Sequence, residues 1–469
     1  MISELHIKNF KCFGNELVTI PLERLTMIFG ANSAGKSTML QALRLLGLSW
    51  ERFEDIRQLR LDHPELGLGT FKNVVHNHEP SEIQIGVSIG GGRTLFTWTE
   101  GTDNPDQAIL RDVDVDGLEL ERVGDRQSGW HVYGGSLARL LPEGTSDELR
   151  EWVCKRLTAS VTGAPLTWRV GFDVLPLNPQ QREEEGIEAF AERERTELAA
   201  NNNLQAAWFA RQDSLLTRVQ AKLKYLASVR EQVRHVFYLG PLRHRGDRWY
   251  ASEPARLDYV GWDGSELGHL EDELIALEVN RLLHLMGLRY VIRGRLVGDT
   301  ARLVEVTLHK CLENREVEDE TGVGLPDVGS GIRQVLPVLV QIAIFLTTPT
   351  PDVFGPVPIL IVEQPELHLH PGLQIELMEV LLDGASILHG PDIGVTVPQV
   401  LAETHSEHMV LRWQRKIRGL AAVPPGLLVL GFKRSHSGNT PQPVVFDASG
   451  DYREWPEGFF EDRLNEVLA

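Results

Sequence analysis

Residues 30–37 read GANSAGKS and match the phosphate-binding P-loop pattern G-x-x-x-x-G-K-[ST]. The apolar run before them, residues 25–29, is typical of a buried strand, and residues 36–48 have the apolar spacing of a helix. A strand–loop–helix context distinguishes a P-loop from a chance match in a glycine-rich turn. This stretch therefore predicts a binding site for a nucleoside triphosphate.

The motif assigns a role to each of its positions. Glycines at both ends allow a tight backbone turn, so that successive N–H groups point at the phosphates. Lys36 is expected to reach the β- and γ-phosphates, and the Ser37 hydroxyl is expected to ligate Mg²⁺. The predicted nucleotide-binding residues of this loop are Gly30, Ala31, Asn32, Ser33, Ala34, Gly35, Lys36, Ser37 and Thr38.

Composition places the chain among soluble, cytoplasmic proteins. A chain of 469 residues is too long to fold around one simple core, so we expect two lobes or a domain with a large insertion. The three cysteines are far apart, which argues against disulfides and a metal cluster and favours a reducing compartment. The N-terminus alternates like a strand rather than a signal peptide. The longest apolar run, residues 335–346, is too short and interrupted to span a bilayer, so no membrane contact is expected.

The net charge of −19 bears on the choice of partners. A protein that coats nucleic acid is usually basic, because affinity depends on contacts with phosphates. Any contact of this chain with nucleic acid is therefore expected to be local or to be made through a partner.

The pattern along the chain predicts three regions. In residues 1–142, strands at 4–9 and 16–21 and hairpins at 81–99 and 110–122 predict an antiparallel sheet beside the P-loop. Residues 143–235 are charged and predicted to be a mainly helical insertion, and the apolar spacing from residue 216 favours a helix packed on the body over a coiled-coil arm. Residues 236–469 alternate between strands and helices, as a parallel sheet does.

A second motif completes the predicted nucleotide site. Residues 358–362 are a run of aliphatic residues that ends at Glu363. In P-loop proteins such a strand, the Walker B motif, delivers a carboxylate beside Mg²⁺. Glu363 and Ser37 are therefore the predicted metal-binding residues.

Four stretches make the chain resemble the ABC-type ATPases allied to RecF, SMC proteins and the overcoming-lysogenisation-defect (OLD) nucleases. The Walker B segment reads VEQPELHLHP over residues 362–371. Residues 327–334, DVGSGIRQ, precede it and are similar to the ABC signature, whose small residues open a helix. Residues 402–406, AETHS, resemble the switch-histidine segment, and residues 450–464 resemble the ending of a bacterial family with the EQPELHLHP form.

The resemblance implies an α/β P-loop NTPase fold of ABC type, with a mixed-sheet core, an antiparallel β subdomain and an inserted helical region. It further implies a homodimer or higher oligomer that closes around ATP and Mg²⁺. Each nucleotide would then lie between the P-loop of one subunit and Gly329, Ser330 and Gly331 of the other. The free N–H groups at a helix N-terminus suit that anion. His405 would contact the γ-phosphate.

The chain departs from the family pattern at Gln364, where ABC proteins have a glutamate that activates water. A glutamine can orient water but cannot act as a general base. Three alternatives remain: Glu363 serves both roles, Glu366 is the base, or hydrolysis is slow and the protein is an ATP-gated switch. In the ABC signature a serine precedes the small residues. Here that position is Gly329, and the serine follows one position later, at Ser330.

Other polar groups have competing interpretations. His368 and His370 with Glu366 can be metal ligands, but the position matches a subunit-contacting loop. The acidic residues Asp112, Asp114 and Asp116 can bind a cation, but an exposed edge strand leading into the Asp116–Gly117 turn is favoured. Arg243 follows a predicted strand, where it can meet a phosphate or form a structural ion pair.

The function we expect is an ATPase subunit that gates or powers a separate effector, such as a nuclease encoded nearby, in bacterial anti-phage defence or DNA metabolism. The alternatives are a nucleotide-sensing scaffold with little turnover and a RecF-like DNA repair factor. A nuclease domain is not expected within the chain, because the 64 residues after His405 contain no D-x-D cluster.

Overall fold

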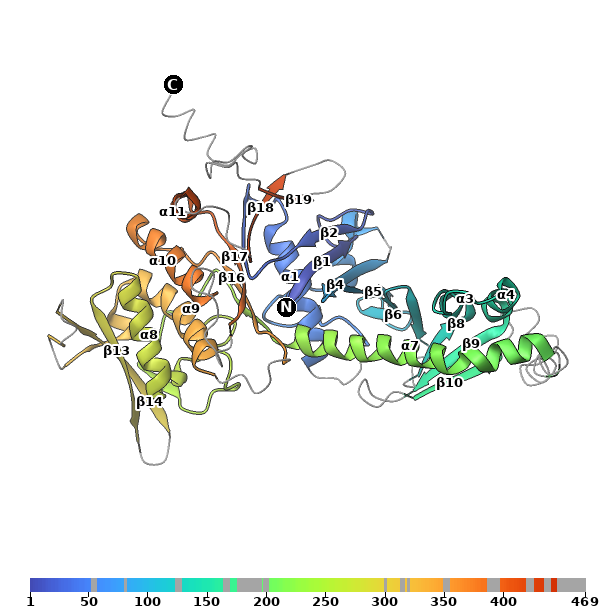
Figure 1. The fold of residues 1–469 in the computed structure, drawn as a ribbon. Coiled ribbons are helices and arrows are strands. Elements are labelled where there is room, and N and C mark those ends of the chain that lie inside the picture. The colour runs from blue at the N-terminus through green and yellow to red at the C-terminus, as the bar shows by residue number, and fades with distance from the viewer. Residues whose placement is uncertain are drawn as a thin grey trace, which may run out of the picture.

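The computed structural model describes most of the chain in three adjoining parts (Figure 1). A parallel sheet lies in the middle, with an antiparallel sheet on one side and a helical lobe on the other. The described residues are 1–51, 57–79, 82–122, 129–162, 169–174, 196, 202–298, 302–312, 317–318, 321–348, 355–385, 397–418, 426–433 and 440–444. The ending at 450–464 that contributed to the family resemblance lies outside them.

The central sheet has six strands in the order β11-β16-β17-β3-β18-β19. The first five are parallel, and β19 runs antiparallel to β18 at one edge. Their bounds are β11 Val236–Leu239, β16 Ile359–Glu363, β17 Gln399–Glu403, β3 Leu25–Gly30, β18 Leu427–Lys433 and β19 Thr440–Pro443. The P-loop strand β3 and the Walker B strand β16 are thus separated by one strand, β17.

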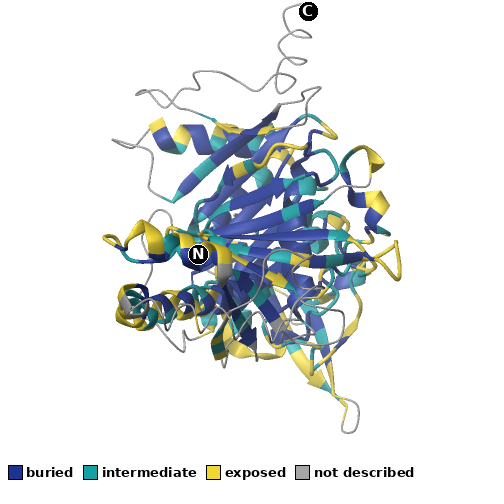
Figure 2. Cartoon of the chain, turned by 90° about the vertical axis from the view of Figure 1, so that its right-hand side faces the viewer, coloured by how far each residue is buried: buried dark blue, intermediate teal, exposed yellow. Residues whose placement is uncertain are grey.

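Helices cover both faces of this sheet, which explains why its inner strands β3, β16 and β17 are mostly apolar and buried, whereas the edge strand β19 is mostly exposed. On β16, Ile359 and Ile361 pack into the core beneath α1 and α7, whereas Leu360 and Val362 pack into the core beneath α8 to α11. The inner strands are accordingly buried along their length (Figure 2). The helices are α1 Lys36–Glu51, α7 Asn202–Arg234, α8 Glu273–Leu285, α9 Ser330–Thr347, α10 Pro371–Gly384 and α11 Glu407–Arg418.

The second sheet is antiparallel and has nine strands in the order β10-β9-β8-β7-β6-β5-β4-β1-β2. Asp116 and Gly117 turn β6 into β7 with positive φ angles of 47° and 83°, as an Asp-Gly hairpin requires. The strands are β1 Ile2–Lys8, β2 Val18–Pro21, β4 Ile83–Ile89, β5 Gly92–Glu100, β6 Ala108–Val115, β7 Leu118–Arg122, β8 Gly129–Tyr133, β9 Leu157–Thr162 and β10 Arg169–Val174. Short helices accompany it: α2 Phe71–Val74, η1 His76–His78, α3 Gly134–Arg139 and α4 Asp147–Arg156.

The two predicted hairpins are confirmed, and the described part of residues 143–235 is mainly helical, in α4 and α7, but it also contains the strands β9 and β10. Strands β9 and β10 pair in register with β8 and extend the antiparallel sheet. The β9 segment LTASVT is short and half of its residues are β-branched, and it follows directly on helix α4, which obscured the strand pattern. The sheet therefore continues through the region that charge and length assigned to helices.

Helix α7 packs on the body, as predicted, and does not form a free coiled-coil arm. It is 33 residues long and runs along the antiparallel sheet (Figure 1). Its buried side includes Leu215, Val219, Val229 and Val233, which are fully shielded from solvent. It contacts α1, α4, β5, β6 and β10, so it joins the two sheets.

The third part is a small sheet that supports α8 and α9. It consists of β12 Trp249–Ala251, β13 Tyr290–Val297, β14 Leu303–Lys310 and β15 Val323–Gly324, with η2 Gly268–Glu271 and η3 Leu325–Asp327. Helix α9 is long and apolar enough to cross a bilayer, yet 61% of it is buried within the protein. It is the central helix of this lobe's core.

Candidate nucleotide site

The P-loop joins β3 to α1 through a backbone that needs its glycines. Gly30 and Gly35 have φ angles of 141° and 106°, which L side chains rarely adopt. A Cβ on Gly30 would lie 2.9 Å from the Phe432 carbonyl oxygen, and one on Gly35 would lie 2.7 Å from the Cys12 Sγ. Both glycines are therefore required by conformation and by close packing.

Lys36 and Ser37 begin α1 and are held in place by the loop and by an acid. Lys36 Nζ donates to the carbonyl oxygens of Gly30 and Ala31, each at 3.0 Å, and lies 3.8 Å from Glu403 Oε1. The Ser37 hydroxyl donates to Glu403 Oε2 at 2.8 Å. The structure thus places the two side chains that the motif assigns to phosphate and cation against the same carboxylate.

Two buried carboxylates meet at the carboxyl ends of neighbouring strands. Glu363 ends β16 and Glu403 ends β17, and the two residues are partners in the parallel register. They are 6% and 3% exposed. Tyr238, on β11, donates its hydroxyl to Glu363 Oε1 at 3.0 Å. Chain segments from both ends of the sequence therefore build one acidic pocket beside Ser37.

Burial and mutual repulsion change the acidity of this pair. Burial, and then the neighbouring Glu403, raise the pKa of Glu363 to about 7, although hydrogen bonds from Tyr238 and Ser37 oppose the rise. Burial also raises the pKa of Glu403, against the effects of Ser37 and Lys36. Two adjacent buried carboxylates favour the approach of a cation.

The segment after β16 crosses the end of β17. Gln364 adopts φ 45° and donates its backbone N–H to the Glu403 carbonyl oxygen at 2.8 Å. Glu366 is 7% exposed, and its Oε1 accepts the His405 backbone N–H at 2.8 Å, whereas its Oε2 is buried without a partner. All three residues therefore lie at the same end of the parallel sheet.

His405 follows β17 and its ring faces the acidic pair. Its Nε2 lies 3.9 Å from Glu403 Oε1, and its side chain is 35% exposed. Burial, and then Lys36, lower the pKa of His405, so the neutral imidazole is favoured. A neutral ring can donate or accept one hydrogen bond at each nitrogen, as a contact with phosphate or water requires.

The signature residues lie at the open N-terminus of α9. Gly329 is the N-cap residue, Ser330 is the first residue of the helix, both are exposed, and no side chain caps the helix. Behind Gly331, Arg333 and Gln334 donate to the carbonyl oxygens of Arg245 and Arg243 at 3.0 and 3.2 Å. These hydrogen bonds of the helix end lead to residues 243–245 and not to the P-loop of the same chain.

Arg243 lies inside the site, between the signature and the Walker B strand. Its Nη2 donates to the Glu363 carbonyl oxygen at 2.9 Å, while its Nε and Nη1 are buried without a partner. Burial lowers its pKa to about 10. Among the described residues it has no ion pair within 4.0 Å, so the interpretation as a structural ion pair is not supported.

The competing metal interpretations gain no support. His370 caps α10, where its Nδ1 accepts the Gly372 N–H at 3.2 Å, and His368 adopts φ 64° in the preceding turn. Asp114 accepts the Gly117 N–H in the β6–β7 turn, and Asp116 pairs with Lys222 at 3.0 Å. The prediction of an edge strand for these residues is wrong, because β6 pairs with β5 on one side and with β7 on the other. No group of three or more histidine, cysteine or acidic residues suited to a metal occurs among the residues that the structure describes.

Sequence reasoning missed Glu403 as a functional residue. The signal was present, because residues 398–402 are an apolar strand that runs into an acid, just as residues 358–362 run into Glu363. What the sequence could not supply was the strand order, which places β17 directly between β16 and β3. That order makes Glu403, more than Glu363, the direct partner of Ser37.

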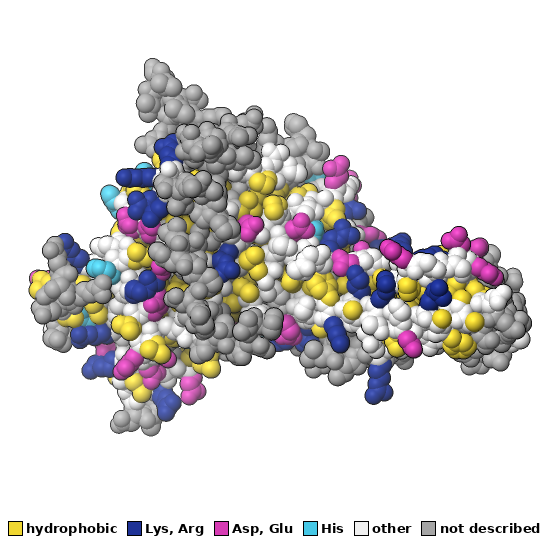
Figure 3. Space-filling model, viewed as in Figure 1, with side chains coloured by type: hydrophobic (Ala, Val, Ile, Leu, Met, Phe, Trp, Pro, Cys, Tyr) yellow, Lys and Arg dark blue, Asp and Glu magenta, His cyan; other side chains and the backbone are white. Residues whose placement is uncertain are grey.

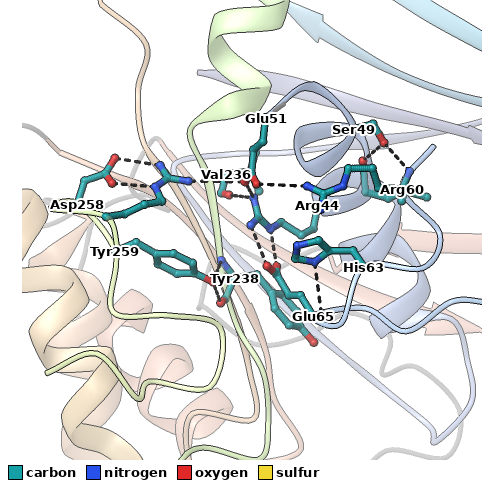
Figure 4. A network of polar contacts seen from close by, with 12 residues as sticks. Arg44, Ser49, Glu51, Arg60, His63, Glu65, Val236, Tyr238, Asp258 and Tyr259 are labelled. Carbon is teal, nitrogen blue, oxygen red and sulfur yellow. Dashed lines mark hydrogen bonds and ion pairs between the residues drawn. The ribbon is translucent and has the colours of Figure 1, made fainter. Parts of the chain in front are cut away.

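A buried network also anchors the P-loop helix to the Walker B side (Figure 4). Arg44, on α1, donates to both carboxylate oxygens of Glu65 and, at 2.6 Å, to the Val236 carbonyl oxygen at the start of β11. Tyr259 donates its hydroxyl to the carbonyl oxygen of Tyr238, the residue that holds Glu363. The position of α1 and that of Glu363 are therefore linked through β11.

Strand order, P-loop geometry and the paired acids define the class of protein. The fold is a mixed α/β P-loop fold with an antiparallel β subdomain. A family model described as "AAA ATPase domain" matches residues 1–85. A second, described as "AAA domain, putative AbiEii toxin, Type IV TA system", matches residues 184–410. ATPase-domain sequence is thus split between the two ends of the chain, as the site itself is.

Solved structures of SMC heads are similar to the whole chain at low identity. An SMC head bound to the C-winged helix domain of ScpA is 11% identical, with a TM-score of 0.39, covering 95% of this chain and 98% of that chain. The SMC head domain from Thermotoga maritima is 11% identical, with a TM-score of 0.35 and coverages of 95% and 99%. That from Pyrococcus yayanosii, with a coiled coil and joint, is 12% identical, with a TM-score of 0.41 and coverages of 100% and 99%.

No curated protein matches the sequence significantly.

Proposed function

We propose that this chain is an ATP-hydrolysing subunit that dimerises around ATP and thereby gates or powers a separate effector protein. The observation that carries the proposal is the assembly of Lys36, Ser37, Glu363 and Glu403 at one end of the parallel sheet. A P-loop supplies phosphate-binding N–H groups, and the acids supply oxygen ligands for a cation. The match of ATPase-domain models to both halves of the site supports the same conclusion.

The chemistry of the site fits Mg²⁺. The ion prefers oxygen ligands, and the Ser37 hydroxyl together with Glu363 and Glu403 offers them. When bound, it neutralises charge on the phosphates. Ser37 and Glu363 would hold it, and Lys36 would hold the phosphates.

Attack on the γ-phosphate requires a positioned water and an acceptor for its proton. Glu363, with its pKa raised to about 7, can hold a proton at neutral pH. Glu366 is the other candidate base, because its Oε2 is buried without a partner beside the His405 backbone. Gln364 would orient the water, and His405 would contact the γ-phosphate.

A second copy of the chain would complete the site. The N-terminal N–H groups of α9 are uncapped by side chains, and Gly329 and Ser330 are exposed. A helix N-terminus in this state binds anions through its free N–H groups and its dipole. Because its described contacts lie away from residues 30–38 of its own chain, the γ-phosphate it serves would be that of another subunit.

The effector would be a separate protein, such as a nuclease encoded nearby, acting in the cytoplasm in anti-phage defence or DNA metabolism. The description of the C-terminal family, which mentions a putative AbiEii toxin, supports a role in defence. Direct coating of nucleic acid is disfavoured by the net charge of −19. On the face drawn in Figure 3, acidic and basic side chains are interspersed.

Steady-state ATP turnover tests this proposal against the alternative of a nucleotide-sensing scaffold. Glu363→Gln is expected to lower the rate by about 100-fold, because acid–base catalysis typically contributes factors of about 10² to 10⁴. Glu121→Gln, an exposed glutamate on β7, is the charge-matched control and should leave turnover unchanged. Wild-type turnover that survives in Glu363→Gln contradicts the assigned role, and absence of turnover in a wild-type chain that binds ATP favours the scaffold.

A further inference from the structure

Glu403 occupies a position that binds both functional side chains of the P-loop. Its Oε2 accepts the Ser37 hydroxyl at 2.8 Å, and its Oε1 lies 3.8 Å from Lys36 Nζ. The carboxylate is 3% exposed, so these contacts are shielded from water. In a nucleotide complex, Ser37 would ligate the cation and Lys36 would reach the phosphates. Glu403 therefore competes with nucleotide for Lys36 and shares Ser37 with the cation.

The charges around this position make a cation necessary. Glu363 and Glu403 face each other in register, and Lys36 Nζ lies 3.8 Å from Glu403 Oε1. Arg243 donates to the Glu363 backbone carbonyl oxygen at 2.9 Å. Triphosphate brought to this pocket would meet two buried carboxylates, and such repulsion is weakly screened.

Glu403 also compensates for the amide at position 364. Glu363 and Gln364 leave the end of β16 with one acid, yet the site retains two because β17 supplies Glu403. The second carboxylate reaches Ser37 from the strand next to β3. A hydroxyl flanked by two carboxylates is an oxygen donor set that suits a divalent cation.

We propose that Glu403 is a ligand of the divalent cation, together with Ser37 and Glu363, and that it makes ATP binding conditional on that cation. The inference rests on the proposed function, because it concerns the same nucleotide. A divalent cation takes the Glu403 and Ser37 oxygens, which frees Lys36 for the phosphates and cancels the repulsion. ATP that arrives without a divalent cation meets the negatively charged Glu403 carboxylate, and it therefore binds weakly.

Equilibrium binding of a fluorescent ATP analogue, measured with Mg²⁺ and with EDTA, tests this inference. For the wild-type chain, Mg²⁺ should raise the affinity by about 100-fold, the size expected for losing a charge-assisted contact and leaving like charges together. Glu403→Gln should reduce this ratio to about tenfold or less, chiefly by tighter binding in EDTA. Glu403→Asp keeps the charge and should retain most of the dependence on Mg²⁺.

The controls separate this inference from the function on which it rests. Glu121→Gln should keep the wild-type ratio, and thermal melting should show that each variant is folded. A folded Glu403→Gln that keeps the wild-type ratio overturns the role of Glu403 alone. A wild-type chain that fails to bind the analogue in both conditions overturns the proposed function as well. Mn²⁺ binding in the presence of the analogue, followed by electron paramagnetic resonance, should weaken in Glu403→Gln and remain unchanged in Glu121→Gln.

Discussion

Replacing Lys36 with alanine is expected to lower the affinity of the chain for ATP by about one hundredfold or more. Hydrogen bonds to charged groups contribute about 1.5–3 kcal/mol each, and the Lys36 ammonium can make two of them to phosphates. Lys36 lies at this end of the P-loop, with its Nζ 3.0 Å from the carbonyl oxygens of Gly30 and Ala31. The measurement is a titration with a fluorescent ATP analogue in Mg²⁺.

The control for Lys36→Ala is Lys72→Ala, which removes the same charge from an exposed position on α2. Its affinity for ATP should equal that of the wild-type chain. Lys36→Ala removes a partner of Glu403, so its folding should be checked by circular dichroism. A folded Lys36→Ala that binds ATP as well as the wild-type chain would show that residues 30–37 are not the phosphate site.

Replacing Arg44 with leucine is expected to lower the free energy of unfolding by about 3–5 kcal/mol, the usual cost of breaking a buried ion pair. Arg44 is 2% exposed and holds Glu65, Glu51 and the Val236 carbonyl oxygen (Figure 4). Its loss leaves Glu65, whose side chain is 2% exposed, as an unpaired buried charge. Urea unfolding followed by circular dichroism measures the change.

A double substitution distinguishes loss of the pair from loss of packing. Arg44→Leu with Glu65→Leu should be more stable than either single variant, because neither charge then remains buried alone. Arg139→Leu, which breaks an exposed pair with Glu119 at 3.4 Å, should change stability by less than about 1 kcal/mol. If Arg44→Leu is as stable as Arg139→Leu, the network does not anchor α1 to β11.

Local motifs predicted the nucleotide-binding half of the fold because each is set by nearby residues. The strand at 25–29, the turn at 30–35 and the helix from Lys36 follow from apolar spacing and from glycines with positive φ. The hairpin at 110–122 follows in the same way from Asp116–Gly117. The order of the strands in the sheet could not be predicted in this way, because no local sequence signal indicates which strands become neighbours.

The role of Glu403 and the strands β9 and β10 show what local patterns cannot give. Glu403 matters because β17 pairs with both β16 and β3, a consequence of sheet topology. Strand β9 forms because β8 offers an edge, although a helix, α4, immediately precedes it in sequence. Arg44 was hidden for a similar reason: its partners, Glu65 and Val236, are 21 and 192 residues away.

The most direct test of ATP-dependent assembly is the molar mass of the chain, measured by light scattering after gel filtration. With Mg²⁺ and a non-hydrolysable ATP analogue we predict a complex of at least twice the 52.6 kDa of the chain, and with ADP a smaller species. Ser330→Arg, which places a bulky charge at the exposed N-terminus of α9, should prevent this change. A mass that is the same with the analogue and with ADP, and unaffected by Ser330→Arg, would contradict a nucleotide site shared between two copies.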